Sequence, residues 1–259
     1  ELCALPAQKR REMGLRAVDL GQETPSPVHL PQAAPALEMK NVALSYRNRP
    51  VLKDVSLRAA PGEVIALVGQ NGAGKTTFSR ALCGLHREDA GEYRWNGRRL
   101  KPKQRMKRAG MVMQDVNYQL FAESVAEECV FGVKRPDLAL AEETLAQLGL
   151  SSLRDRHPGA LSGGQKQRLA AAAAIVGGKE LLVFDEPTSG LDYDSMARLA
   201  AQIRRLAEEG RVIFIVTHDY EFICRTCSRA LHLDGSKLRN DLPVTAENLS
   251  EIRAILGVR

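Results

Sequence analysis

Residues 63–77, EVIALVGQNGAGKTT, join an unbroken apolar run to a glycine-rich turn. An apolar run without alternation is typical of a strand that is buried on both faces of a parallel sheet. The turn fits the spacing G-x-x-x-x-G-K-[ST], and the residues that follow it, TTFSRALCGL, have the pattern of a helix. The segment therefore predicts a strand, a loop and a helix in immediate succession.

The loop, residues 69–77, has the composition of a phosphate-binding site. Its glycines allow backbone N–H groups to turn toward phosphate oxygens without a Cβ clash, and the helix adds its positive dipole end. Lys75 can reach the β- and γ-phosphates of a nucleotide, and Thr76 can offer a hydroxyl to Mg²⁺. A glycine-rich turn without a ligand is the alternative. The expected nucleotide contacts are Gly69, Asn71, Gly72, Gly74, Lys75, Thr76 and Thr77.

A second chemical centre is expected at LLVFDEP, residues 181–187. Asp185 and Glu186 end an apolar strand, and the carboxyl ends of parallel strands face the crevice in which α/β proteins bind ligands. Asp185 would hold Mg²⁺, and Glu186 would polarise an attacking water. Acids at strand ends are often merely solvated, so this interpretation depends on their pairing with the Lys75 loop.

A third motif, LSGGQ at residues 161–165, begins a predicted helix. A serine and two glycines at a helix N-terminus form an anion-binding end. Because the Lys75 loop already holds the phosphates of its own nucleotide, this second anion site would face the nucleotide of another copy. Ser162, Gly163, Gly164 and Gln165 therefore predict a dimer that shares its sites.

The whole chain has the composition of a compact α/β protein. It has 259 residues, a formal net charge of +6, 44% hydrophobic residues and 26% charged residues, which excludes wholesale disorder and a disulfide scaffold. No apolar run approaches the ~20 residues that cross a bilayer, so we expect no integral membrane protein. Apolar strands alternate with helical segments, which predicts a mainly parallel sheet covered by helices. A hairpin is expected at Asn96-Gly97.

Residues 1–36 differ from the rest of the chain. The first part is weakly helical, and GQETPSPVHLPQAAPA is rich in proline, which favours an extended linker. With Glu1 as the first residue, this predicts the tail of a preceding domain and a linker before a domain at 37–259. The five cysteines are scattered, which favours a reducing compartment. Cys224 and Cys227 are a redox or metal pair or, as we expect, two buried residues on one helix.

Five motifs in order resemble those of the ATP-binding-cassette (ABC) ATPases. They are GQNGAGKTT, Gln114 after an apolar strand, LSGGQ, LLVFDEPTSGLD, and His218 at a strand end. The resemblance covers residues 46–218. It implies a P-loop NTPase fold with an antiparallel β subdomain and a helical signature subdomain at about 115–175. It also implies an ATPase that uses ATP and Mg²⁺.

The resemblance assigns roles to single residues. Tyr46 matches the aromatic that stacks on adenine, with a half-buried strand tyrosine as the plain alternative. Gln114 matches a residue that contacts Mg²⁺ and the attacking water, and His218 matches one that contacts the γ-phosphate. The LSGGQ serine and second glycine would contact the γ-phosphate held by the opposite subunit, and Asp192 would link the two sites.

Residues 114–131, QDVNYQLFAESVAEECVF, resemble a segment of energy-coupling-factor (ECF) transporter ATPases, which drive uptake of vitamins and transition-metal ions. The implied partners are a second ABC ATPase domain, either a copy of this chain or a fused half, a transmembrane coupling subunit and a substrate-binding membrane subunit. The implied location is the cytoplasmic face of the membrane. Asp115-Val116 and Glu128-Cys129 depart from the usual Asn-Pro and Asp-Val, and the pattern looks closer to the second half of tandem ATPases.

Two stretches have open interpretations. The apolar residues of the same segment are expected on a short helix, partly in the core and partly in a groove for a helix of the membrane subunit; they are Leu120, Phe121, Val125, Val130 and Phe131. Residues 94–108 hold eight Lys/Arg and no Asp/Glu. They would contact nucleic acid or anionic lipid or, as the plain expectation, form a solvated hairpin and loop.

A soluble ABC-type ATPase that acts on nucleic acid or the ribosome is the alternative function. Such proteins usually carry coiled-coil insertions or paired cassettes, and this chain has no heptad run, so no nucleic-acid partner is expected. A cassette that binds ATP without turnover is a third possibility, which the presence of Glu186 and His218 disfavours.

Overall fold

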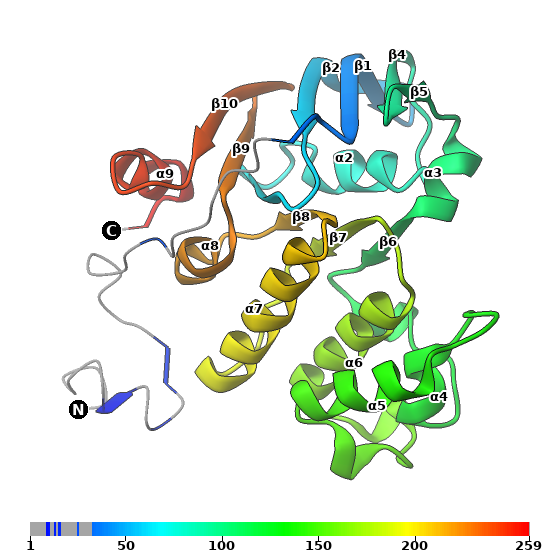
Figure 1. The fold of residues 1–259 in the computed structure, drawn as a ribbon. Helices are drawn as coiled ribbons and strands as arrows, with labels where there is room; N and C mark the ends of the chain where they lie inside the picture. Colours follow the sequence, from blue (N-terminus) through cyan, green and yellow to red (C-terminus); the bar gives the residue numbers. More distant parts are fainter. Residues whose placement is uncertain (1–8, 11–12, 14, 17–24, 26–32, 259) are drawn as a thin grey trace.

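The computed structural model describes residues 9–10, 13, 15–16, 25 and 33–258 of the chain. The tail and linker expected at residues 1–36 lie mostly outside the described residues. Figure 1 shows a central sheet, a smaller sheet packed beside it, and a group of helices that projects away from both.

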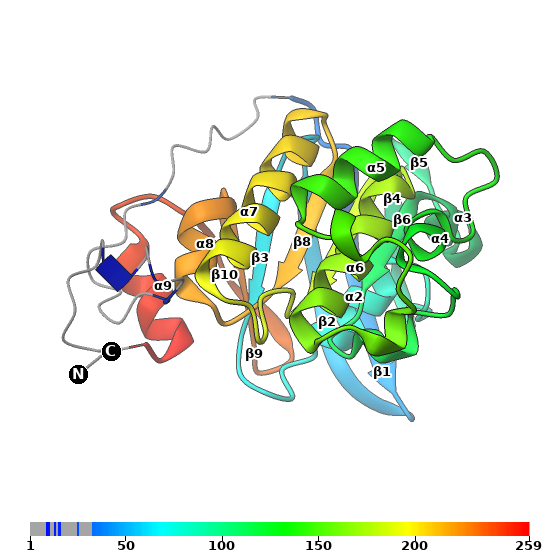
Figure 2. The same cartoon turned by 90° about the horizontal axis from the view of Figure 1, so that it is seen from below.

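The central sheet of the described chain has six strands in the order β10-β9-β3-β8-β7-β6 (Figures 1 and 2). Five of these run parallel, and β10 pairs antiparallel with β9. This confirms the expected parallel sheet. The strands are β3 (Val64–Val68), β6 (Ala109–Val112), β7 (Leu181–Asp185), β8 (Val212–Val216), β9 (Arg229–Asp234) and β10 (Lys237–Pro243).

The smaller sheet is antiparallel, with the strand order β2-β1-β4-β5. Trp95 pairs with Arg98 across the turn at Asn96-Gly97, which confirms the predicted hairpin. The strands are β1 (Leu37–Tyr46), β2 (Arg49–Ala59), β4 (Ala90–Trp95) and β5 (Arg98–Arg99).

The helices fall into two groups. α4, α5 and α6 pack on one another in the projecting group, and α6 also contacts β6 of the central sheet. α2, α7, α8 and α9 lie close to the central sheet, and α3 leads into β6 (Figures 1 and 2). None of the helices that the structure describes is long and apolar enough to cross a membrane. The helices are α2 (Lys75–Leu82), α3 (Pro102–Arg108), α4 (Val125–Val130), α5 (Leu138–Gln147), α6 (Gly163–Val176), α7 (Tyr193–Glu208), α8 (Tyr220–Thr226) and α9 (Leu249–Leu256), with 3-10 turns at Val116–Tyr118, Ser151–Leu153 and Pro158–Ala160.

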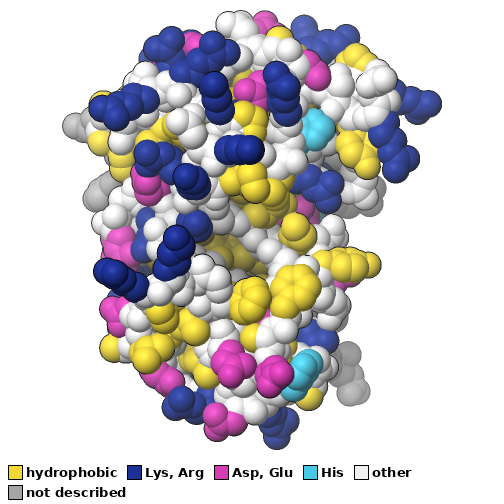
Figure 3. Space-filling model, turned by 90° about the vertical axis from the view of Figure 1, so that its right-hand side faces the viewer, with side chains coloured by type: hydrophobic (Ala, Val, Ile, Leu, Met, Phe, Trp, Pro, Cys, Tyr) yellow, Lys and Arg dark blue, Asp and Glu magenta, His cyan; other side chains and the backbone are white. Residues whose placement is uncertain are grey.

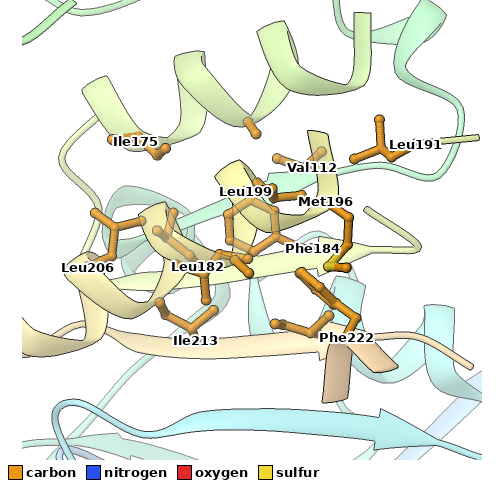
Figure 4. Packing of buried hydrophobic residues seen from close by; sticks show 14 of the residues in the cluster. Val112, Ile175, Leu182, Phe184, Leu191, Met196, Leu199, Leu206, Ile213 and Phe222 are labelled. Carbon is orange, nitrogen blue, oxygen red and sulfur yellow. The ribbon is translucent and has the colours of Figure 1, made fainter. Parts of the chain in front are cut away.

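Two hydrophobic cores lie on the two faces of the central sheet. Val64, Ala66 and Val68 of β3 pack with α6, α7 and α8, while Ile65 and Leu67 pack with α2 and the antiparallel sheet. Successive side chains of a strand point to opposite faces, so an unbroken apolar strand serves both cores. Figure 4 shows the first core, where residues of α7 such as Leu199 and Met196 lie over Leu182 and Phe184 of β7.

Two expectations need correction. The helix expected to carry the apolar residues of QLFAESVAEECVFG is confined to α4, because Ser124 caps its first turn by accepting a hydrogen bond from the Glu127 N–H. Leu120 and Phe121 therefore precede the helix, and Phe131 directly follows it. The basic stretch 94–108 is more than a hairpin and a loop, because its second half forms α3.

Gly84 allows α3 to pack against the end of α2. Its φ is +76°, and a Cβ at this position would lie 2.2 Å from the carbonyl oxygen of Pro102. Gly149 has a similar φ of +68°, but a Cβ there would have no neighbouring atom within 4 Å. Substitution of Gly149 therefore isolates the cost of the backbone conformation from the cost of a clash.

We predict that Gly84→Ala lowers the free energy of unfolding by more than Gly149→Ala does. The control should cost ~1–2 kcal/mol, because a left-handed conformation is unfavourable for an L-residue, and Gly84→Ala adds the clash with Pro102. Thermal or urea unfolding measures both variants. Equal losses of unfolding free energy in the two variants would show that the close approach of α3 to Gly84 does not contribute to stability.

Candidate nucleotide site

The carboxyl ends of β3, β7 and β8 lie side by side at one edge of the central sheet. The loop after β3, the acids that end β7 and the histidine after β8 therefore meet around one cavity of about 430 Å³, which Gln114 after β6 also borders. Val51 and Val216 line the cavity as well, although the sequence did not single them out. The predicted site residues that line it are Tyr46, Asn71, Gly72, Gly74, Lys75, Thr76, Thr77, Gln114, Asp185, Glu186 and His218.

The glycine-rich loop holds its own lysine. α2 begins at Lys75, whose Nζ donates hydrogen bonds to the carbonyl oxygens of Gly69 (2.6 Å) and Gln70 (3.1 Å). Burial lowers the pKa of Lys75, and the charges of the two acids that end β7 oppose that shift. Gly74 has a φ of +99°, and a Cβ there would lie 2.7 Å from Val51. The loop is thus packed closely against β2 and carries a cation beside two acids.

Glu186 has an unusual backbone. Its φ is +51°, a left-handed conformation that is costly for a residue with a side chain. Its N–H donates a hydrogen bond to the carbonyl oxygen of Val216 (2.8 Å), which fixes the chain to the end of β8. Its Oε1 lies 2.9 Å from Nδ1 of His218. The His218 side chain is 82% exposed, whereas that of Glu186 is 13% exposed. The carboxylate is therefore held in place at the bottom of the cavity, beneath an accessible imidazole.

Asp185 lies deeper than Glu186. Only 4% of its surface is exposed, and burial, assisted by the charge of Glu186 and opposed by Lys75 and Arg80, raises its pKa. Thr76 and Gln114 border the same cavity. A carboxylate, a hydroxyl and an amide oxygen are the hard oxygen donors that suit Mg²⁺. The residues present therefore fit a magnesium ion that is held with bound phosphate and water.

The LSGGQ motif lies outside this cavity. Ser162 caps α6, because its Oγ accepts a hydrogen bond from the Gln165 N–H (3.3 Å), and the Gln165 side chain accepts one from the Ser162 N–H (2.9 Å). A Cβ on Gly164 would lie 3.5 Å from the carbonyl oxygen of Gly190, so the motif packs against the SGLD loop. Ser162 and Gly163 are exposed. Within one chain, these residues do not join the Lys75 loop.

Asp192 has a structural role within its own chain. Its carboxylate caps α7 by accepting a hydrogen bond from the Ser195 N–H (2.7 Å), and this bond lowers the pKa of Asp192. Arg168 of α6 also donates to the Ser195 hydroxyl. The cap and the Arg168 contact tie the SGLD loop to the signature helix.

Sequence reasoning missed a cluster beside His218. Arg16 donates hydrogen bonds to Asp219 and to Glu221 (3.0 Å), the latter being 1% exposed. Asp219 also accepts from the Thr188 hydroxyl (2.8 Å). A second cavity of about 390 Å³ is bordered by this cluster, Glu186 and His218. In the sequence, the cluster is signalled by Arg16, which lies in a region without a motif. No pattern in the sequence pairs this arginine with acids about 200 positions away.

The cysteine pair is buried as expected, although Cys227 lies just outside the expected helix. Cys224 lies on α8 and Cys227 directly follows it, and both are buried. Burial raises the pKa of Cys227 to about 12, so its thiol stays protonated at neutral pH and is a poor nucleophile. Among the described residues there is no group of three or more His, Cys, Asp or Glu placed to hold a metal ion.

Comparison with known proteins identifies relatives that share most of this chain. A Treponema denticola protein with the provisional name ABC transporter ATP-binding protein is 47% identical over 216 residues, which are 83% of this chain and 44% of that protein. A second match in the same organism, under the same name, is 41% identical over 247 residues, or 93% and 50% of the two chains. The chain thus spans about half the length of these relatives.

Solved structures show the same fold. CbiO1 from Clostridium perfringens, described as part of the ABC transporter complex CbiONQ, has a TM-score of 0.74 and 25% identity, covering 86% of this chain and 93% of its own. A bacterial Atm1-family ABC exporter with ATP bound has a TM-score of 0.77 and 23% identity, covering 92% and 44%. The second likeness concerns the fold alone.

A family model also matches more than half of the chain. Residues 52–189 match the model described as ABC transporter. These residues include the Lys75 loop, the signature motif and the acids that end β7. The chain therefore belongs to the ABC transporter family, and it has the P-loop NTPase fold of the ATP-binding domains of that family, which bind ATP with Mg²⁺.

Proposed function

We propose that this chain is the ATP-hydrolysing domain of an ABC importer of the ECF type, and that the cavity at the ends of β3, β7 and β8 is its reaction site. The observation that carries the proposal is the convergence of Lys75, Asp185, Glu186 and His218 at one sheet edge. A cation for phosphate, an acid for Mg²⁺ and a paired carboxylate for water are the parts that phosphoryl transfer to water requires.

Each residue has a role that its surroundings support. The loop N–H groups and Lys75 would bind the phosphates, Tyr46 would stack on adenine, and Thr76, Gln114 and Asp185 would hold Mg²⁺. When bound, the ion would neutralise charge that develops on the phosphate oxygens. Glu186 would accept a proton from the attacking water while His218 orients the γ-phosphate. The 2.9 Å contact between these two side chains keeps the carboxylate directed into the site.

The shared-site dimer is part of the proposal. Ser162 and Gly163 are exposed at the N-terminus of α6, and neither they nor Gly164 border their own chain's cavity. Ser162 and Gly164 would meet the γ-phosphate held by a second ABC ATPase domain, either a copy of this chain or the other half of a tandem protein. Asp192 lies in the loop against which the signature motif packs. It would therefore link the two nucleotide sites of the dimer.

A groove beside the helical group supports a membrane partner. It has a volume of about 410 Å³ and lies between β6, the end of α4 and α6, and Figure 3 shows hydrophobic side chains around a hollow on this face. Val125 is fully buried, whereas Phe121 and Phe131 are 69% and 60% exposed with ring centres 6.4 Å apart. One part of the apolar segment is thus buried in the core, and the other part is exposed to solvent beside the groove. Exposed apolar side chains of this kind are what a docking surface for a partner helix requires.

The groove is connected to the reaction site through Gln119. This residue borders the groove, and its side-chain amide accepts from the Met113 N–H (2.6 Å) and donates to the Met111 carbonyl oxygen (2.7 Å). Glu128 fixes the opposite wall by accepting from the backbone N–H groups of the two residues that follow Leu120, both at 2.7 Å. A partner that moves these walls would shift the backbone next to Gln114, which is the proposed route from transport to hydrolysis.

The ECF branch rests on two observations that point the same way. The segment 114–131 resembles the ECF pattern. This chain also has the same fold as CbiO1 of the CbiONQ complex over 93% of the CbiO1 chain. The proposed partners are a transmembrane coupling subunit and a substrate-binding membrane subunit, and the proposed location is the cytoplasmic face of the membrane. The proposed solutes are vitamins or transition-metal ions.

Glu186→Gln should retain ATP and lose hydrolysis, because glutamine keeps the shape of the side chain but cannot accept the proton. We expect turnover to fall by at least ~100-fold and an ATP-dependent dimer to accumulate. Steady-state ATPase assays and sedimentation measure the two effects. Glu208→Gln, the same change on an exposed face of α7, should match wild type. Wild-type turnover by Glu186→Gln would remove the proposed base.

Asp185→Asn should make the nucleotide-free protein more stable at pH 7 and abolish its extra stabilisation by Mg²⁺ with ATP. An acid whose folded pKa is raised binds more protons folded than unfolded, so its charge costs stability as pH rises above the ordinary Asp value of ~3.9. The gain in melting temperature should therefore shrink toward pH 4. Asp155→Asn, at a 90% exposed side chain, is the control. A variant that melts lower than wild type at pH 7 would contradict this account.

The double variant Phe121→Ser and Phe131→Ser should keep basal ATP turnover and lose stimulation by the membrane subunits. The full-length protein, reconstituted with its membrane subunits in vesicles, provides the stimulation assay. Leu138→Ser removes a side chain of similar exposure, 65%, that does not border the groove, and it should keep full stimulation. If the double variant is stimulated as well as Leu138→Ser, the groove is not the docking site.

A further inference from the structure

The positive charge of the chain is concentrated in one segment. Residues 87–108 contain nine Lys/Arg and three Asp/Glu, a net charge of +6, while the rest of the chain has 28 of each. The formal charge of the whole sequence is also +6. One short segment therefore accounts for the entire net charge of the molecule, which creates a local single-sign field.

Most of these cations are exposed, and most of the acids nearby are already paired. Glu88 accepts from Arg105 (2.6 Å), Glu92 from Arg94 (2.8 Å), and Glu180 from Arg108. Glu92 also lies 3.9 Å from Arg99. The remaining exposed cations form what we call the basic face, which consists of Arg87, Arg98, Arg99, Lys101, Lys103 and Lys107.

The basic face is built on a rigid support. The guanidinium of Arg105 in α3 is 3% exposed and stacks 3.8 Å from the centre of the Tyr93 ring while it pairs with Glu88. α3 is therefore fixed to β4 and to the chain after α2. A cavity of about 910 Å³ is bordered by four members of the basic face, namely Arg87, Arg99, Lys101 and Lys103, among other residues. These cations converge on a common space rather than being dispersed over the surface.

The basic face adjoins the apolar groove. α3 leads directly into β6, whose Gly110 and Met111 border the groove. Lys179, on the groove wall, donates to the carbonyl oxygen of Lys107 (3.1 Å). Figure 3 shows Lys and Arg side chains mainly in the upper half of this side, above the hydrophobic band. Met106 of α3 is also 48% exposed and stands between two basic residues in the sequence.

We propose that the basic face binds the anionic headgroups of the membrane surface beside the groove. Exposed cations next to exposed apolar side chains fit a bilayer that presents acidic phosphates above a hydrocarbon layer. Nucleic acid is the less suitable ligand, because the aromatic residues of this region, Tyr93 and Trp95, are buried and offer no stacking surface. The placement beside the membrane rests on the proposed function of the groove, whereas the affinity for lipid does not.

The test measures flotation of the full-length protein with vesicles that contain no membrane subunit. Binding should occur to phosphatidylcholine mixed with phosphatidylglycerol, weaken as salt rises, and be absent with phosphatidylcholine alone. Each basic residue near an anionic surface strengthens binding about fivefold. Lys103→Glu with Lys107→Glu should therefore weaken binding about 25-fold or more.

The matched control is Lys53→Glu with Lys237→Glu, which makes the same change in net charge at exposed lysines of β2 and β10, away from α3 (Figure 1). It should weaken binding less than about threefold. ATP binding by both double variants shows that they are folded. Equal losses in the two double variants would overturn the proposal, as would equal binding to neutral vesicles or tighter binding of a DNA oligonucleotide than of the acidic vesicles.

The outcomes for lipid and for the groove can be told apart. A protein that is stimulated by its membrane subunits but does not bind acidic vesicles contradicts the lipid proposal alone. A protein that binds acidic vesicles through the basic face but is never stimulated contradicts the proposed groove function and leaves the lipid site intact.

Discussion

The structure depends on burying β3 on both of its faces. Because every side chain of this strand is apolar, it must lie between two cores, with α6, α7 and α8 on one side and α2 with the antiparallel sheet on the other. Its parallel neighbours β8 and β9 take the same direction. Their carboxyl ends therefore meet at one edge, and the chemistry of the molecule is concentrated where this edge emerges from the two cores.

Much of this arrangement could be predicted from the sequence, because the motif residues directly follow apolar strands. Lys75, Asp185 and His218 each come at or shortly after the end of such a strand. The parallel pairing of these strands is therefore sufficient to bring the three residues to one edge of the sheet. β9 and β10 could not be anticipated, since β9, RALHLD, is short and has no regular alternation, and β10 is mostly polar. Only their pairing with β3 and with one another defines them as strands.

Other features could not be predicted because they depend on distant contacts or on details of backbone conformation. The bonds from Arg16 reach acids about 200 positions away along the chain. The helix α3 was not predicted, because its sequence is mostly charged and has no apolar face. It is held in place by the stacking of Arg105 on Tyr93, which the sequence does not reveal. The left-handed backbone of Glu186 is likewise invisible in the sequence, although it brings the carboxylate to His218. Local strain of this kind is often found at functional sites.

The two hydrogen bonds from Lys75 to its own loop have a consequence for nucleotide affinity. A lysine side chain has about 2 kcal/mol of rotamer entropy to lose when it is immobilised. Here most of that loss occurs when the chain folds, because the ammonium is already anchored on the carbonyl oxygens of Gly69 and Gln70. Binding of a triphosphate then requires the ammonium to exchange partners over a short distance, without a search through the rotamers of a free side chain. The loop is in this sense preorganised, and the free energy of folding contributes to the strength of binding.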